Sequence, residues 1–421
     1  MERRSAIGSK VEPKRQGPRP LPLHLRLATS AWLGSNAAWT SLSAGWPISK
    51  GMLAERARKL AAEAASLDPA RLAEALDREG RRRYGEFLDG VLAYRRHPYR
   101  RTLEDPPELW REGSTRLLDY APGGGVAVFV VPSLVNRAYV LDLAPERSLL
   151  RSWAAEGLRP LLIDWGWPSE GERGFALTHY IQRLERALDA AVAAAGRPAA
   201  AVGYCMGGLL ALALAQRRTA DMGGLVLLAT PWDFHAERAE EARRVGAIGA
   251  ALMPVVEAWG ELPLDLLQAF FALVDPMQVP RKFITFAGLE PQSEKARLFV
   301  ALEDWLNDGV PLTAGVAREC LVGWYGENRP GGGRWEVAGE QVRPERLKLA
   351  SLIVVPGADR IVPPLTALAL AERIPGAERL YPHAGHIGMV VGSGSDRLMW
   401  EPVRRWIEAR ASGAARTKRR A

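Results

Sequence analysis

The stretch Val202-Gly203-Tyr204-Cys205-Met206-Gly207-Gly208 joins an apolar run, predicted as a strand, to a run of small and apolar residues, predicted as a helix. Gly203 and Gly207 stand two residues on either side of Cys205. This spacing suits a tight strand-to-helix turn, in which the backbone passes its neighbours with no Cβ atoms in the way. Such a turn presents the sulfur at the N-terminus of the helix, where unpaired amides and the helix dipole favour a thiolate. The pattern therefore predicts Cys205 as a nucleophile rather than as a small buried apolar residue.

An acid and a base candidate follow this cysteine, each just after an apolar run. Asp359 is the candidate acid and His386 the candidate base, and glycines stand on both sides of His386. Nucleophile, acid and histidine in this chain order are typical of the α/β-hydrolase arrangement. His383 is the alternative base and Asp233, which also ends a predicted strand, is the alternative acid. The order predicts that Cys205, Asp359 and His386 meet in the folded chain.

Apolar strands alternate with amphipathic helices from Gly125 onward, the pattern of βαβ units in a mostly parallel sheet. We therefore expect an α/β fold, with the sheet flanked by helices. The predicted strands are Val126 to Val131, Pro160 to Ile163, Ala199 to Val202, Gly224 to Leu228, Leu352 to Val355 and Glu378 to Tyr381. The predicted helices are Pro145 to Glu156, Thr178 to Ala195, Met206 to Arg217, Pro364 to Ile374 and Arg397 to Ala411.

Composition and residue spacing divide the chain into five parts. A basic leader, 1–20, precedes a helical extension, 21–115, whose Ala-, Leu-, Glu- and Arg-rich segment has helical spacing. The α/β core takes residues 116–233 and 344–411, and a basic tail follows at 412–421. A long insert with several prolines, 234–343, separates the two parts of the core, and we expect it to form a helical lid over the nucleophile.

Charge and composition limit the classes of partner. The net charge of +8 lies in the two tails, because residues 1–20 carry six basic and two acidic residues and residues 411–421 carry four basic residues and no acidic one. The neutral body argues against a nucleic-acid-binding domain, and the tails are expected to be solvated. There is no uninterrupted apolar run of membrane-spanning length and no secretory signal, and with only two cysteines, Cys205 and Cys320, a cytoplasmic location without structural disulfides is expected.

Trp32, Trp39 and Trp46 recur every seven residues in the extension. On a helix this interval returns to the same face after two turns. We interpret the three residues as a strip that packs against the rest of the protein. The alternative is an adhesive patch for a lipid-like or polymer surface.

Two backbone amides are candidates for holding the oxyanion of an acyl-transfer reaction. One is that of Met206, directly after the nucleophile, and the other lies in the loop Pro132-Ser133-Leu134-Val135-Asn136, after the first strand of the parallel series. Sulfur at the turn favours acyl groups that arrive as thioesters, because the acyl group then moves between two thioesters at little thermodynamic cost. Hydrolysis remains an alternative wherever water reaches the acyl-enzyme.

The chain resembles the polyhydroxyalkanoate synthases, particularly the short type whose catalytic subunit works beside a second protein. The resemblance rests on PSLVNRAYVLDL (132–143), IDWGWP (163–168), GYCMGG (203–208), and GADRIVP with GHIGM (357–363 and 385–389). GYCMGG alone is also similar to the dienelactone hydrolases, and the first two segments favour the synthases. Arg360 stands where members of the family usually have a histidine, directly after the acid.

The resemblance implies an acyltransferase that polymerises (R)-3-hydroxyacyl-CoA and releases CoA through a covalent acyl-cysteine. Cys205 would be the acylated nucleophile, His386 its base and Asp359 the acid, with the amides of Met206 and Val135 as the oxyanion hole and Asn136 and Asp142 as structural support.

No cofactor or metal is implied beyond acyl-CoA as substrate. The expected partners are the polyester chain, a granule surface, and a second copy or accessory subunit. The alternative functions are a Cys-dependent hydrolase, namely an intracellular polyhydroxyalkanoate depolymerase, a thioesterase or a dienelactone-hydrolase-like enzyme, and a non-catalytic granule-surface protein.

Overall fold

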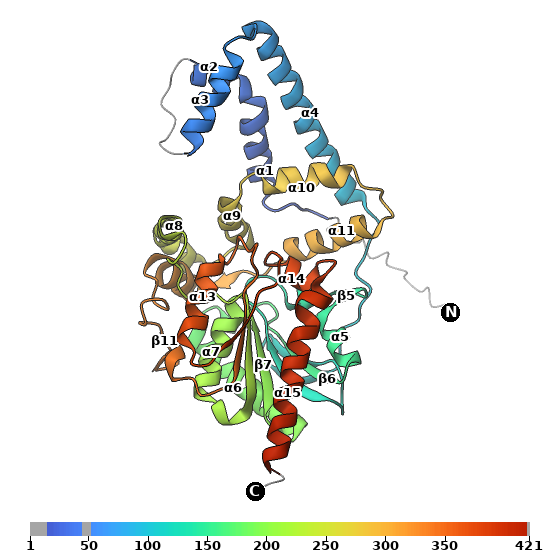
Figure 1. Cartoon of the computed structure of the whole chain (residues 1–421), viewed down its shortest axis with the longest axis vertical. Helices are drawn as coiled ribbons and strands as arrows, with labels where there is room; N and C mark the ends of the chain where they lie inside the picture. Colours follow the sequence, from blue (N-terminus) through green and yellow to red (C-terminus); the bar gives the residue numbers. More distant parts are fainter. Residues whose placement is uncertain (1–14, 44–51, 419–421) are drawn as a thin grey trace, which may run out of the picture. The chain divides into compact units, whose positions relative to one another are not determined.

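The computed structural model describes residues 15–43 and 52–418 of the 421-residue chain (Figure 1). The described chain divides into two compact units. Residues up to Arg100 and the segment Asp275–Asn307 form the first unit, and Arg101–Val274 with Asp308 onward form the second. The expected insert, 234–343, thus contributes residues 275–307 to the first unit and its remaining residues to the second.

The first unit is helical, and its core consists of aromatic and aliphatic side chains of its longest helix and of the two helices from the insert segment. Phe87 and Phe283 are fully buried, and their rings meet edge to face with centroids 6.3 Å apart. A Cβ on Gly90 would lie 2.1 Å from the carbonyl oxygen of Phe283, so glycine allows the two helix backbones to touch there. Its elements are α1 (Leu21–Ala28), η1 (Thr29–Leu33), α2 (Ser35–Ser43), α3 (Met52–Ala64), α4 (Pro69–Arg96), α10 (Gln278–Ala287) and α11 (Glu294–Asn307).

The tryptophan series starts in this unit. Trp32 packs against the buried cluster, with its ring 6.4 Å from that of Phe87 in an edge-to-face arrangement. Trp39 is half-buried, and Trp46 lies outside the described residues. Trp32 therefore packs against other residues, as the first interpretation predicts. The described residues do not place all three tryptophans on one face.

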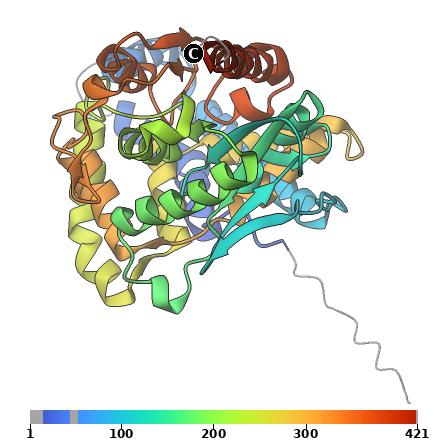
Figure 2. The same ribbon diagram turned by 90° about the horizontal axis from the view of Figure 1, so that it is seen from below.

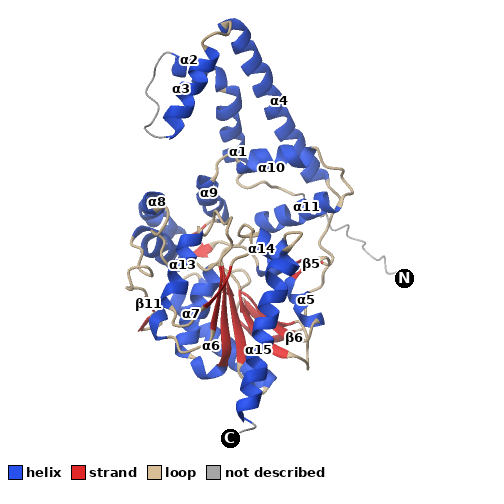
Figure 3. Ribbon diagram, in the orientation of Figure 1, coloured by secondary structure: helices blue, strands red, loops and turns tan. Residues whose placement is uncertain are grey.

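The second unit is built on an eight-stranded sheet in the order β1-β2-β6-β3-β7-β8-β13-β14 (Figure 3). From β6 to β14 all neighbours are parallel, whereas β1 and β2 are antiparallel at one edge. The strands are β1 (Glu108–Glu112), β2 (Thr115–Asp119), β3 (Val126–Val131), β6 (Leu158–Asp164), β7 (Ala199–Tyr204), β8 (Met222–Leu228), β13 (Ser351–Val354) and β14 (Glu378–Leu380).

All six strands predicted from the sequence are present, and this sheet confirms the predicted α/β class. The edge strand β1 and its neighbour β2 were not predicted, and residues 108–112 and 115, which the sequence assigns to the helical extension, belong to the sheet. The sequence ELWRE of β1 has no clear alternation of apolar and polar residues, so it lacks the period-two pattern by which a half-buried strand is recognised.

Helices cover both faces of the sheet (Figure 2). A Cβ on Gly203 of β7 would meet α7, 2.5 Å from the Cα of Gly208, whereas one on Gly224 of β8 would meet the ring of Trp406 in α15 at 3.1 Å. Gly203 pairs with Leu227 and Ala200 with Gly224, so these glycines point to opposite faces and α7 and α15 lie on opposite sides. The main helices are α5 (Leu149–Ala155), α6 (Leu177–Ala195), α7 (Met206–Arg217), α13 (Pro364–Arg373), α14 (Gly388–Val391) and α15 (Glu401–Lys418).

The part of the insert that belongs to the second unit is mostly helical. Its close packing depends on small residues, since a Cβ on Gly246 would lie 2.3 Å from the Cα of Gly326. In the parts of the chain that the structure describes, none of the helices combines the length and apolar character that a membrane crossing needs. The elements of this part of the insert are α8 (Ala239–Trp259), β9 (Glu261–Leu262), α9 (Leu264–Val274), β10 (Leu312–Thr313), α12 (Ala314–Arg318), η5 (Glu319–Gly326), β11 (Glu336–Val337) and β12 (Glu340–Gln341), and η6 (Pro344–Arg346) directly follows the insert.

Short elements complete the second unit. The helix predicted from Pro145 begins at Leu149, because residues 147–148 form β5. The Ser148 hydroxyl caps the helix by accepting a hydrogen bond from the amide of Arg151. The remaining elements are η2 (Ala138–Leu141), β4 (Asp142–Ala144), β5 (Arg147–Ser148), η3 (Glu170–Glu172), η4 (Thr219–Asp221) and η7 (Asp396–Trp400).

Candidate active site

Cys205 occupies a strained turn between β7 and α7. Its φ of 56° and ψ of −125° lie in a region that residues with a Cβ rarely adopt. The strand and helix on either side hold it there: the Cys205 amide donates to the Leu228 carbonyl at 2.8 Å, and its carbonyl accepts from the Gly208 amide at 2.9 Å. The side chain is partly exposed. This is the geometry predicted for the turn from its glycine spacing.

The glycines around Cys205 are required by close backbone contacts. A Cβ on Gly207 would lie 2.2 Å from the carbonyl oxygen of Val131 and 2.4 Å from that of Pro132, so helix α7 begins directly against the loop after β3. A Cβ on Gly208 would lie 1.8 Å from the hydroxyl of Thr230. Larger residues at either position would push the helix away from the loop or from β8.

His386 and Asp359 form a buried pair. Nδ1 of His386 lies 2.7 Å from Oδ2 of Asp359, and the two residues are 8% and 4% exposed. The other carboxylate oxygen of Asp359 accepts hydrogen bonds from the amides of Ile361 at 2.8 Å and Val362 at 2.9 Å. The carboxylate therefore has partners on both oxygens, and the imidazole is held by one of its two nitrogens.

Cys205 lies close enough to this pair for its sulfur to act on the pKa of His386. Burial lowers the pKa of His386, but the negative charge of the Cys205 sulfur, the hydrogen bonds with Asp359 and Cys205, and the charge of Asp359 outweigh it and raise the pKa from 6.5 to about 10. The arrangement favours the protonated form of the His386 imidazole. Cys205, Asp359 and His386, which are 154 and 27 residues apart along the chain, are thus brought together.

The alternative acid and base lie elsewhere. His383 is exposed. Oδ1 of Asp233 accepts hydrogen bonds from Nδ2 of Asn328 at 2.8 Å and from the amide of His235 at 2.9 Å, which joins the loop after β8 to the segment after η5. Asp233 therefore has a structural role in the described chain, whereas Asp359 is the carboxylate bonded to His386.

The loop after β3 reaches the nucleophile turn through Pro132. The indole N–H of Trp165, in the segment after β6, donates to the Pro132 carbonyl at 3.1 Å, and that carbonyl also faces Gly207. The amide of Val135 donates to the hydroxyl of Ser133 at 3.0 Å. Asn136 has a φ of 64° and accepts a hydrogen bond from Gln268 at 3.3 Å. The loop thus has its own internal partners and lies against the N-terminus of α7, where Met206 begins the helix.

Asp142, in the segment that follows this loop, is fully buried. Its carboxylate accepts hydrogen bonds from the Ser148 hydroxyl at 2.6 Å and from the Arg151 guanidinium at 2.9 Å, and Arg101 and Tyr120 also contact it. These contacts hold in place the segment that follows the loop 132–136.

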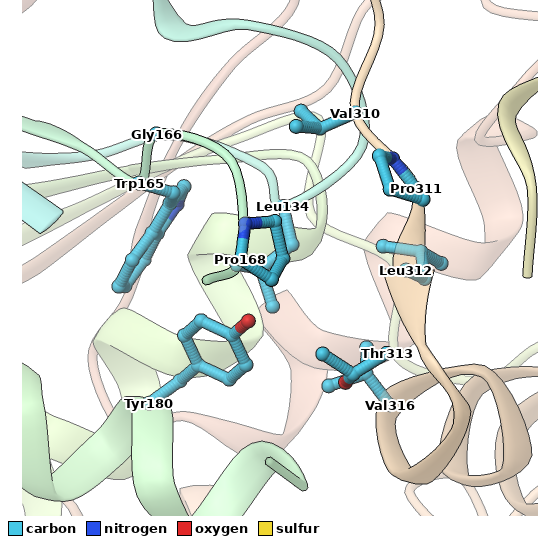
Figure 4. Close-up of a pocket in the computed structure, with 10 residues that line it drawn as sticks. All are labelled: Leu134, Trp165, Gly166, Pro168, Tyr180, Val310, Pro311, Leu312, Thr313 and Val316. Carbon is cyan, nitrogen blue, oxygen red and sulfur yellow. The ribbon is translucent and has the colours of Figure 1, made fainter. Parts of the chain in front are cut away.

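An apolar pocket lies beside the same loop (Figure 4). Leu134 lines it, one residue before Val135, and Trp165 meets Tyr180 edge to face with ring centroids 5.3 Å apart. The space is about 270 Å³, including its opening to solvent. The other lining residues are Gly166, Pro168, Val310, Pro311, Leu312, Thr313 and Val316.

Three residues near the site were not assigned a role from the sequence. Tyr204, just before the nucleophile, contacts His386. Trp165 holds the Pro132 carbonyl, and Ser133 holds the Val135 amide. The partners of Tyr204 and Trp165 come from other loops, so spacing along the chain does not reveal them, whereas Ser133 bonds to Val135 within the same loop. Cys205 and Cys320 are both free, and among the described residues no group of three histidine, cysteine or acidic side chains is arranged to bind a metal ion.

Residues 121–399, well over half of the chain, match the family model described as the alpha/beta hydrolase family. The chain belongs to the alpha/beta hydrolase family. Among solved structures, a thermophilic esterase from Thermogutta terrifontis aligns with a TM-score of 0.43 at 17% identity, over 73% of this chain and 98% of the esterase.

Several curated proteins are similar to this alpha/beta hydrolase. The poly(3-hydroxyalkanoate) polymerase subunit PhaC of Haloferax mediterranei is 28% identical over 72% of this chain and 63% of its own length. The subunits of the same name from Synechocystis and Allochromatium vinosum are 27% and 26% identical, each over 68% of this chain and over 78% and 81% of their own lengths. This chain thus spans under two thirds of the Haloferax relative. The relatives confirm the resemblance to polyhydroxyalkanoate synthases.

Proposed function

We propose that this protein is an acyltransferase that polymerises (R)-3-hydroxyacyl-CoA into a polyhydroxyalkanoate. The observation that carries the proposal is the buried pair of His386 and Asp359 beside Cys205 on its strained turn. The polymerase relatives support the substrate class. The family match by itself is equally compatible with a hydrolase, which the experiment below distinguishes.

In the proposed first step, the Cys205 thiolate attacks the carbonyl carbon of the acyl-CoA thioester. Negative charge develops on the carbonyl oxygen, and the amides of Met206 and Val135 are proposed to hold it, that of Val135 by exchanging its hydrogen bond with the Ser133 hydroxyl for one with the substrate. The carbon–sulfur bond to CoA then breaks, and the CoA sulfur takes the proton of the His386 imidazolium. CoA leaves as a free thiol, and the acyl group remains on Cys205 as a thioester.

In the second step, His386 accepts the proton of a hydroxyl group at C3 of another acyl unit as its oxygen attacks the acyl-cysteine. An ester bond forms, the thioester to Cys205 breaks, and the sulfur returns as a thiolate beside the protonated imidazole. Asp359 holds the ring by Nδ1 and stabilises its charge in both steps. Each added unit therefore converts one thioester to one ester and releases one CoA, with no cofactor.

We further propose that the protein works in the cytoplasm on the surface of polyester granules, as a homodimer or with an accessory subunit. The basic residues at both ends of the sequence support an anionic surface as a contact.

The test is incubation of the full-length protein with (R)-3-hydroxybutyryl-CoA, followed by mass spectrometry of the intact protein and of the peptide carrying Cys205. The expected result is acyl mass on Cys205, release of CoA and ester-linked oligomer. Cys205→Ala should show none of the three, and Cys320→Ala should retain them. Free 3-hydroxybutyrate in place of oligomer would indicate a hydrolase, and no acyl mass with no CoA would overturn the proposal.

A further inference from the structure

Tyr204, the last residue of β7, touches His386 in two ways. Its hydroxyl donates to the main-chain carbonyl of His386 at 3.2 Å. Its ring lies almost parallel to the imidazole, with centroids 5.2 Å apart and planes inclined by 27°. Tyr204 is 4% exposed, so neither contact competes strongly with water. One side chain therefore contacts both the backbone and the ring of the proposed base.

We propose that Tyr204 is a positioning residue that sets the backbone and the ring plane of His386 relative to Cys205. This inference rests on the proposed function, in which His386 serves Cys205 as its base.

The reason lies in how the His386 loop is held. His386 is in an irregular segment after β14, where no strand ladder fixes the backbone. On one side this loop is hydrogen-bonded to the loop that carries Asp359. The amide of Ala358 donates to the Ala384 carbonyl at 3.0 Å, and the amide of Gly357 donates to the Pro382 carbonyl at 3.0 Å. On the other side Tyr204 bonds to the carbonyl of His386 itself. Because Tyr204 directly precedes Cys205, this second bond ties the base to the strand that carries the nucleophile.

The two contacts have different chemistry. The hydroxyl is a permanent donor, because burial, with the charges of Cys205 and Asp359, raises the pKa of Tyr204 well above its usual range. The ring presents its electron-rich face to the imidazole, which favours the protonated form over the neutral one. Loss of the hydroxyl should thus loosen the loop, whereas loss of the ring should also disfavour the imidazolium that accompanies the thiolate.

Several titratable groups meet at this point. Cys205 and Asp359 act on His386, both toward its protonated form. Removal from water is the main cause that raises the pKa of Cys320 and of Tyr325, both from η5, and the charge of Cys205 adds to it in each case. A change in the titration of Cys205 after substitution of Tyr204 must therefore be compared with a substitution in η5.

The experiment compares Tyr204→Phe, Tyr204→Leu and the control Tyr325→Phe in the full-length protein. Tyr325 is a half-buried tyrosine influenced by Cys205, and its ring packs on Phe234. Two quantities are measured: kcat and KM for CoA release from (R)-3-hydroxybutyryl-CoA, and the rate of alkylation of Cys205 by iodoacetamide between pH 5 and 10. Peptide mass spectrometry separates Cys205 from Cys320.

We expect Tyr204→Phe to lower kcat by about five-fold, the effect of one hydrogen bond, with KM little changed and the alkylation profile close to that of the wild type. Tyr204→Leu should lower kcat by about 30-fold or more and shift the alkylation profile to higher pH. Tyr325→Phe should leave both readouts near wild type.

A lowered melting temperature in Tyr204→Leu with unchanged kcat and an unchanged alkylation profile would mean that the residue is merely structural, and the inference would be wrong. An equal shift in Tyr325→Phe would also overturn it. If the wild type releases no CoA, the proposed function fails, while the alkylation profiles still report whether Tyr204 positions His386 beside Cys205.

Discussion

Oδ2 of Asp359 lies 2.7 Å from Nδ1 of His386, and Oδ1 of the same carboxylate is held by two backbone amides. The backbone therefore holds the Asp359 carboxylate in place, and the carboxylate in turn holds the imidazole ring of His386. With Nδ1 occupied by Asp359, the ring presents Nε2 as its free nitrogen to the reacting groups. This makes the tautomer of His386 depend on a single side chain.

Asp359→Asn should keep the shape of the site but replace an acceptor by an amide that can donate to Nδ1. The wrong tautomer would then be favoured, and kcat for CoA release should fall by about 10²- to 10⁴-fold. Asp233→Asn is the matched control, because Asp233 bonds to Asn328 and to the His235 amide. If the two substitutions lowered kcat equally at the same melting temperature, Asp359 would not be the orienting acid.

Removal of the sulfur should change the titration of His386. The charge of Cys205 is the largest influence that raises the pKa of His386 to about 10, against the lowering effect of burial. In Cys205→Ala the protonated ring loses that partner while its burial remains, so its pKa should fall. NMR of protein labelled at its six histidines measures this, with His386→Gln to assign the signal. A signal that titrates at the same pH in wild type and Cys205→Ala would show that the two side chains do not interact.

Gly207→Ala should disrupt the contact between the nucleophile turn and the loop after β3. The new Cβ would lie 2.2 Å from the Val131 carbonyl oxygen, so either α7 or the loop must move, at a cost of about 1–3 kcal/mol. We expect a lower melting temperature and loss of CoA release together. Gly174→Ala is the control, since a Cβ there meets nothing within 4 Å. An active, fully stable Gly207→Ala variant would show that the turn does not need this close approach.

The sequence was sufficient for the parallel part of the fold and for the three residues that meet at the site. Buried parallel strands are continuous apolar runs, and the glycine spacing around Cys205 reflects a backbone contact that no Cβ allows. Asp359 and His386 could be predicted as partners of Cys205 because each of them follows a strand, and parallel strands end at one edge of the sheet.

Other features could not be predicted because they depend on contacts between distant segments. The edge strand Glu108–Glu112 pairs only with its neighbour and carries no strong apolar pattern. Residues 275–307 belong to the helical first unit although they lie inside the insert, since Phe283 packs against α4, which is distant in sequence. The role of Tyr204 depends on a carbonyl 182 residues away.

Glu172 provides a test of how the segment after β6 is stabilised. This segment carries Gly166 and Pro168 to the apolar pocket. Glu172 is 4% exposed. Its carboxylate accepts hydrogen bonds from the amides of Ser114 at 3.0 Å and Ser169 at 2.7 Å and pairs with Arg183 at 2.6 Å. Burial raises its pKa, but these hydrogen bonds outweigh it and lower the pKa from 4.5 to about 2. The ionised form is thus the one that the fold stabilises.

A pKa that is lower in the folded than in the unfolded protein adds stability above pH 4.5, where the Glu172 carboxylate is ionised in both states. This stability is lost as the pH falls toward 2. The difference between the two pKa values corresponds to about 3 kcal/mol. Glu172→Gln should therefore be less stable than the wild type at pH 7, and the gap in the free energy of unfolding should narrow between pH 4.5 and 2.5. Glu170→Gln, at an exposed position of the same short helix, should match the wild type throughout. A gap that is independent of pH would mean that Glu172 acts through shape and hydrogen bonds rather than through its charge.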